Sequence, residues 1–114
     1  MTSRIDGYKS KYKVLARELS KVGFAIDGSL VQLSARCGKP NCRCKEDPPQ
    51  LHGPYWQWSA KVAGKTISRR LDDEEASLYR EWIANRRHIE AVLTEMKAIA
   101  SKAVDIQLKE LRQQ

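Results

Sequence analysis

The feature that most constrains this chain is a cluster of metal-binding residue types within residues 37–52. Cys37, Cys42, Cys44 and His52 follow the pattern C-x4-C-x-C-x7-H, and these are all 3 Cys of the sequence. Three thiolates and one imidazole form a complete tetrahedral ligand set for Zn²⁺. An odd number of closely spaced cysteines argues against a disulfide framework. We therefore predict a structural zinc site, with a redox-active thiol cluster and a loop of free thiols as the alternatives.

Four protein ligands would leave the metal no open position for water or substrate, so this site predicts stabilisation rather than catalysis. Two other patterns suggest enzymes but have simpler explanations. Gly64-Lys65-Thr66 lacks the earlier glycine of a phosphate-binding loop, because Ser59 stands at that position. The acidic run from Asp72 to Glu75 resembles a cation site of a nuclease, but a helix N-cap explains the same residues with fewer assumptions. We expect a protein that is not an enzyme.

The spacing of apolar residues predicts a helix on each side of the cysteine cluster. Alternating steps of three and four residues, typical of a heptad seam, connect Ile5, Tyr8, Tyr12, Leu15, Leu19 and Val22. Gly23 follows as a stop signal. Asp72 is the expected N-cap of a second, longer helix, with Glu75 placed to close a capping box. We predict a single α+β domain over 1–114, with an N-terminal helix (1–24), a zinc-bearing β-segment (28–71) and a long helix (72–112).

The long helix carries a second heptad seam, which predicts a coiled-coil-like stem. Its positions are Leu78, Trp82, Asn85, Ile89, Val92, Met96, Ile99, Ala103 and Ile106. The N-terminal helix is about half as long, so antiparallel packing would leave part of the seam for a second copy or another protein. A buried Asn85 would help to fix the register of such a pairing. The alternative is a kinked or broken helix that folds back on itself.

The β-segment is expected to form a small antiparallel sheet of three strands. Strands are predicted over 29–34, 55–62 and 65–71, with a tight turn at Ala63-Gly64 between the last two. Successive side chains of a strand point to opposite faces, so Trp56 and Trp58 share a face with Ala60 and Val62. This grouping favours packing against the helices. Tyr55 faces the other way and is the better candidate for stacking on exposed bases.

The positive charge is concentrated in the β-segment. The chain has 21 Lys+Arg against 14 Asp+Glu, a formal net charge of +7. Residues 36–70 hold eight of these cations, with Glu46 and Asp47 as their acidic residues. A concentrated basic patch is typical of proteins that bind nucleic acid. The predicted contact residues are Lys39, Arg43, Lys45, Tyr55, Lys61, Lys65, Arg69 and Arg70. The alternative is a soluble edge hairpin that its cations protect from aggregation.

These motifs support a resemblance that runs from Gly28 to about Arg87. The matching residues are Gly28-Ser29-Leu30, Cys37-Gly38-Lys39, Cys42, Cys44, His52-Gly53-Pro54-Tyr55 and Gly64-Lys65-Thr66. Together they resemble a bacterial family of short uncharacterised proteins that combine this zinc-like motif with a basic hairpin and a long helix. Members of that family are often found near mobile elements or phages. The resemblance implies a setting of DNA transactions and supplies no catalytic mechanism.

The function expected from the sequence is therefore that of a zinc-stabilised DNA-binding accessory or regulatory protein, in the setting of a mobile element or phage. The main alternative is a protein-interaction adaptor that uses the seam of the long helix, and RNA binding is a weaker alternative. No apolar run approaches the ~20 residues that span a bilayer, and the N-terminus lacks the apolar stretch of a signal peptide. We expect a cytoplasmic protein that forms oligomers or binds a protein partner.

Overall fold

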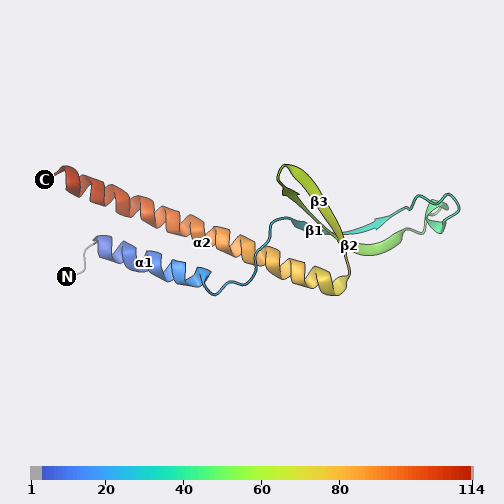
Figure 1. Ribbon diagram of the computed structural model, residues 1–114, viewed down its shortest axis with the longest axis horizontal. Helices are drawn as coiled ribbons and strands as arrows, with labels where there is room; N and C mark the ends of the chain where they lie inside the picture. Colours follow the sequence, from blue (N-terminus) through green and yellow to red (C-terminus); the bar gives the residue numbers. More distant parts are fainter. Residues whose placement is uncertain (1–3, 114) are drawn as a thin grey trace. The chain divides into compact units, whose positions relative to one another are not determined.

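Along the chain, a helix is followed by a three-stranded antiparallel sheet and a second, longer helix, which confirms the predicted α+β class (Figure 1). The structure is a computed structural model that describes residues 4–113. Its elements are α1 (Arg4–Leu19), β1 (Ser29–Ala35), the 3-10 helix η1 (Arg43–Lys45), β2 (His52–Val62), β3 (Lys65–Leu71) and α2 (Asp73–Arg112). The part of the predicted N-terminal helix that falls on residues 1–3 lies outside the described residues. The alternative of a broken second helix is wrong, because α2 is continuous.

Three element boundaries differ from those predicted, and the first is the end of β1 at Ala35, one residue beyond the predicted end at Ser34. Helix α1 ends at Leu19, and the next three residues continue as tighter turns, in which Val22 N–H donates to Leu19 O at 3.3 Å. Such 3-10-type turns are common at the C-terminal end of an α-helix. Strand β2 begins at His52, three residues before the predicted start at Tyr55.

The contacts within the chain gather in two compact units. That the chain forms a single domain over 1–114 stays a prediction. The helical unit contains the residues up to Ala25 and those from Ala84 onward. The sheet unit is Ile26–Ile83. Helix α2 contributes its first turns to the sheet unit and the rest of its length to the helical unit.

In the helical unit, α1 packs antiparallel to α2, as the heptad seams predict. Near the end of α1, Oε2 of Glu18 lies 3.8 Å from Nε2 of His88 in the first half of α2. Ile5, at the start of α1, shares an apolar groove with Ile99 and Ala103 in the second half of α2. Ile5, Val92 and Met96 are buried, while Ile89, Ile99, Ala103 and Ile106 are partly exposed. The seam thus buries residues within one chain. Pairing with a second copy stays a prediction.

Asn85 and Leu78 have surroundings that the heptad seam did not predict. Half-buried Asn85 donates from Nδ2 to the backbone oxygen of Phe24 at 2.8 Å, within the helical unit. It therefore holds the segment that follows α1. Leu78 is 48% exposed, so this position of the predicted seam is not buried within the chain. The buried positions in the first turns of α2 are Ala76 and Ile83.

In the sheet unit, the antiparallel order β1-β2-β3 gives the sheet two chemically different faces. Trp56 and Trp58 share one face with Leu71 and Arg69, their register partners on β3. The first turns of α2 cover this face, because Tyr79 packs against Trp58 with ring centroids 5.4 Å apart. Ala60, Leu71, Ala76 and Ile83 are buried here, which confirms the predicted packing of the tryptophans against a helix. Val62, predicted to share that face, is 49% exposed.

Two glycines allow backbone conformations that the sheet unit requires. Ala63 and Gly64 have φ of 51° and 80°, so the predicted tight turn has the left-handed residues of a type I′ hairpin. Gly28 has φ of 119°, and a Cβ atom there would lie 2.4 Å from Nε1 of Trp58 and 2.6 Å from Ser59 O. The chain therefore passes directly against β2, and this approach allows no side chain at position 28.

The start of α2 confirms the predicted capping box. Glu75 N–H donates to Asp72 Oδ1 at 2.8 Å, and Asp72 N–H donates to Glu75 Oε1 at 3.1 Å. Each side chain satisfies a backbone donor that the first turn of a helix leaves unpaired. Asp73 also accepts a hydrogen bond from Trp56 Nε1 at 3.0 Å, which ties β2 to the same turn. No helix in the described part of the chain is long and apolar enough to cross a membrane.

Candidate metal centre

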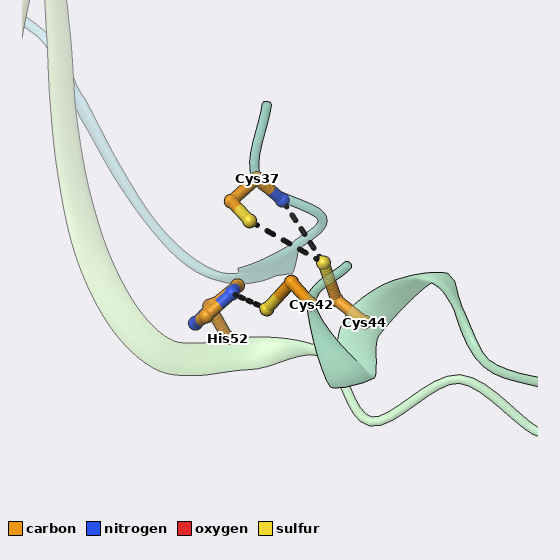
Figure 2. Close-up of side chains that lie close together, drawn as sticks. All are labelled: Cys37, Cys42, Cys44 and His52. Carbon is orange, nitrogen blue, oxygen red and sulfur yellow. Dashed lines mark hydrogen bonds between the residues drawn. The ribbon is translucent and has the colours of Figure 1, made fainter. Parts of the chain in front are cut away.

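The four predicted ligands converge at one end of the sheet (Figure 2). The donor atoms of Cys37, Cys42, Cys44 and His52 all lie within 4.8 Å of one another. Sγ of Cys42 is 3.0 Å from Nε2 of His52, and Sγ of Cys44 is 3.6 Å from Sγ of Cys37. All three cysteines are free thiols. The structure therefore confirms that residues 15 positions apart in the sequence, Cys37 and His52, form one cluster that could hold a metal.

Short local structures bring the three cysteines together. Cys37 follows the end of β1, and Cys42 is the N-cap of η1, which contains Cys44. Cys42 N–H donates to Lys39 O at 3.4 Å, and Lys45 N–H donates to Cys42 O at 2.9 Å, so two successive turns bend the chain around the cluster. Nζ of Lys45 also donates to the backbone oxygen of Cys37. These turns fold the segment without a strand or a long helix.

A bulge in β2 places the histidine. Leu33 pairs with Tyr55, but Ala35 pairs with His52, so β2 has one residue more than β1 over this interval. Gly53 lies in the bulge with φ of 108°, and a Cβ atom there would be 2.9 Å from Leu33 O. An extra residue reverses the alternation of a strand. By this register, His52 shares the face of Ala35 and Tyr55, whereas an unbroken strand would place it on the face of Trp56.

The cluster favours the thiolate form of one ligand. Cys37 N–H donates to Sγ of Cys44 at 3.2 Å. This hydrogen bond lowers the pKa of the Cys44 thiol, although desolvation opposes the shift. Cys44 is also the most buried of the four, with 0% of its surface exposed. Metals bind the thiolate form, so the backbone of Cys37 prepares Cys44 for coordination.

The donor set fits a closed tetrahedral site. Zn–S bonds of about 2.3 Å in a tetrahedron place sulfur atoms about 3.8 Å apart, close to the 3.6 Å between Cys44 and Cys37. Three sulfur donors and one imidazole nitrogen suit a soft or borderline metal ion. All four positions would be taken by protein atoms, so such a metal would brace the loop and bind no substrate.

The predicted nucleic-acid contacts divide between the segment that joins β1 to β2, residues 36–51, and the hairpin of β2 and β3. Lys39, Arg43 and Lys45 are exposed on the segment between β1 and β2, and Lys61 and Lys65 are exposed beside the hairpin turn. Arg69 and Arg70, although adjacent, lie on opposite faces of the sheet.

The two arginines have different surroundings. Arg69 Nη1 donates to the Tyr79 hydroxyl at 3.1 Å, and its guanidinium lies 5.9 Å from the Trp58 ring centroid. Arg69 therefore takes part in the contact between the sheet and α2. Arg70 lies over the ring of Tyr55, with 3.8 Å between the guanidinium carbon and the ring centroid. The structure thus brings Tyr55 and Arg70 together and separates Arg69 from them.

Sequence reasoning missed two features that shape this region. Tyr79 packs between Trp58 and Trp82 in tilted ring contacts, with centroids 5.4 and 5.3 Å apart, and belonged to no predicted seam. The bulge at Gly53 was also missed, although a Gly-Pro pair next to an alternating segment is a known signal for a bulge or an irregular strand edge.

The comparisons with known proteins identify a family of undetermined activity. No curated protein and no solved structure matches the chain. One protein-family profile, described as a domain of unknown function (DUF6788), matches residues 4–81. The match begins with α1, earlier than the resemblance noted from the motifs, and it includes the whole sheet and all four cluster residues. Because the profile covers more than half of its length, the chain belongs to the uncharacterised DUF6788 family.

Proposed function

We propose that this protein is a zinc-stabilised, non-catalytic DNA-binding protein that acts as an accessory or regulatory factor. The setting of a mobile element or phage is part of the proposal and derives from the motif resemblance alone. The observation that carries the proposal is that the strands of the sheet carry cations and no acidic residues. None of β1, β2 and β3 contains Asp or Glu, while β2 and β3 together supply Lys61, Lys65, Arg69 and Arg70.

The segment that joins β1 to β2 adds further cations at one end of the sheet. Lys39, Arg43 and Lys45 lie between the cysteine ligands or directly beside them. A bound metal would fix the backbone that carries these side chains, which lowers the conformational entropy lost on binding. Zinc is the proposed metal because sulfur-rich tetrahedral sites select it. Lysine and arginine side chains on such a surface would contact backbone phosphates.

A second candidate function, that of an adaptor for another protein, is supported by the helical unit. Ile5, Tyr8 and Tyr12 of α1 line an apolar groove with Ile99 and Ala103 of α2. Val104, at 57% exposed, extends this apolar surface. Exposed apolar surface of this kind marks interaction sites in many proteins. The groove would also serve for pairing with a second copy of the chain.

The test is a salt titration of zinc-loaded full-length protein with labelled duplex DNA and duplex RNA, followed by fluorescence anisotropy. We expect DNA affinity to fall steeply with salt because cations on the protein displace counterions from phosphates. The triple variant Lys39→Ala, Lys61→Ala and Lys65→Ala should reduce the slope of log K against log salt by about 3. The matched control Lys97→Ala, Lys102→Ala and Lys109→Ala removes the same charge from the helical unit and should leave the slope near that of the wild type.

Two outcomes would contradict the DNA proposal. Absence of binding to either duplex and to single strands at low salt would exclude a nucleic-acid function and favour the adaptor. In that case Ile99→Glu with Ile106→Glu should abolish self-association or capture of a protein partner. Equal loss of affinity in both triple variants would show that binding depends on the net charge of the protein rather than on the cations of the sheet unit.

A further inference from the structure

The sheet has a second face, opposite to the one that α2 covers, and its composition points to a ligand. We call this the open face and define it by the register as the side that carries Ser29, Val31, Leu33, Tyr55, Gln57, Ser59, Lys61, Thr66, Ser68 and Arg70. Val31 and Leu33 are 45% and 37% exposed. The open face has two cations and no acidic side chain.

Near the end of β3, on the open face, the guanidinium of Arg70 lies over the ring of Tyr55. The Arg70 guanidinium carbon is 3.8 Å from the centroid of the Tyr55 ring. Arg70 is exposed, whereas Tyr55 is half-buried, so the tyrosine supports the arginine from below. Nucleobases stack on guanidinium planes as well as on aromatic rings. The outer side of the Arg70 guanidinium therefore offers a positively charged stacking surface.

The neighbours of this pair suit the remaining parts of a nucleotide. Ser59 Oγ and Ser68 Oγ are 2.9 Å apart, and Gln57 Nε2 donates to Ser59 Oγ at 3.5 Å, which places a line of hydrogen-bonding groups beside the stack. Lys61 stands further along the same face towards the hairpin turn. Apolar contact, hydrogen-bonding groups and a cation for phosphate thus occur on one surface.

We propose that the open face binds the unpaired bases of single-stranded nucleic acid, with one base stacked on Arg70 and Tyr55. This inference rests on the proposed function and refines it by naming the form of nucleic acid. A duplex hides the faces of its bases, so only an unpaired base can use the stacking surface. An acidic peptide would satisfy the cations but would gain nothing from the paired planes of Arg70 and Tyr55.

The experiment compares labelled strands that differ only in their bases. Zinc-loaded full-length protein is titrated with a single-stranded DNA, with an abasic strand of equal length and phosphate number, with single-stranded RNA, and with poly-glutamate as competitor. One stacked base contributes enough to predict about tenfold tighter binding of the strand with bases than of the abasic strand. Single-stranded RNA should also bind about tenfold more tightly than the abasic strand, because DNA and RNA both offer base planes. Any difference in affinity between the DNA and RNA strands reports on contacts to the sugar.

Matched variants separate stacking from charge. Tyr55→Leu removes the aromatic plane but keeps an apolar side chain, and Arg70→Lys removes the guanidinium plane but keeps the charge. Each should bring the ratio of affinities for the strand with bases and the abasic strand close to one. Tyr55→Phe should preserve it. Arg69→Lys makes the same exchange on the covered face and should also preserve it. Zinc content and circular dichroism of each variant show whether it has folded.

The outcomes distinguish failure of this inference from failure of the proposed function. Equal, salt-sensitive binding of the two wild-type strands would overturn the stacking role and leave DNA binding intact. No binding of any strand or duplex would overturn both. Loss of the ratio in Arg69→Lys as well as in Arg70→Lys would refute the assignment to the open face. Poly-glutamate that competes as well as the strand with bases would point to an acidic peptide instead.

Discussion

Strand β2 belongs to two regions that are held together in different ways. At its start lies the metal loop, residues 36–51, in which Cys44 is the one buried residue of a stretch that the structure describes throughout. Further along, Trp56 and Trp58 meet α2 in what we call the sheet–helix contact, where Ala60 and Ile83 are buried. The metal loop has almost no apolar burial, so the proposed metal would be its main source of stability, whereas the sheet–helix contact is stabilised by packing.

The largest expected effect comes from removing one ligand of the proposed zinc. Structural zinc sites contribute on the order of 10 kcal/mol to the folding of small domains. Cys42→Ser should abolish stoichiometric zinc and remove hydrogen-exchange protection from residues 36–51, while residues 56–62 keep most of theirs. Elemental analysis and hydrogen-exchange mass spectrometry measure both. Asn41→Ser changes the neighbouring residue to the same side chain and should retain one zinc per chain.

This prediction also tests the division into two regions. Full zinc occupancy in Cys42→Ser would show that the residue is not a ligand. Loss of protection over the entire chain would show instead that the sheet–helix contact depends on the metal and that the two regions are not independent.

A smaller effect is expected at Gly28, on the side of the sheet–helix contact. Gly28→Ala would force a Cβ atom against Trp58 at a φ that side chains rarely adopt, with an expected loss of about 1–3 kcal/mol in the free energy of unfolding. Zinc content should not change. Gly38→Ala is the matched control in the metal loop, because nothing lies within 4 Å of the added atom. Urea unfolding followed by circular dichroism compares the two, and equal losses would contradict the steric argument.

The smallest effect is expected at the helix cap. Asp72→Ala removes the acceptor for Glu75 N–H and should cost about 1 kcal/mol of stability, the usual contribution of an N-cap. Asp72→Asn keeps an acceptor oxygen and should recover most of that loss. Thermal unfolding measures both variants. A loss in the alanine variant as large as that in Gly28→Ala would mean that the cap also organises the sheet–helix contact.

The sequence predicted the cysteine cluster and most elements because their signals are local. Ligand types at close spacing identified the metal centre, and Lys65–Leu71 was predicted as β3 with the bounds that the structure shows. The helix cap was predicted because its two partners are three residues apart.

The main errors of the sequence-based prediction concern what an element packs against rather than which elements form. Leu78 fitted the heptad, but the first turns of α2 pack on a sheet, so Ala76 and Ile83 face inward instead. Periodicity shows that a helix has an apolar side and does not identify what covers it. The approach of Gly28 to Trp58 could not be predicted either, because it depends on a contact between residues 30 positions apart. The pairing of Arg70 with Tyr55 likewise requires the strand register.

The placement of the tryptophans has a spectroscopic consequence. All 3 Trp of the sequence lie in the sheet unit, at positions 56, 58 and 82, while the helical unit holds most of the helix. Intrinsic tryptophan emission therefore reports on the sheet unit alone, and far-UV ellipticity at 222 nm (a standard helix wavelength) is dominated by the helical unit. One unlabelled sample, heated once and observed by both signals, would show whether the two units melt together or one after the other.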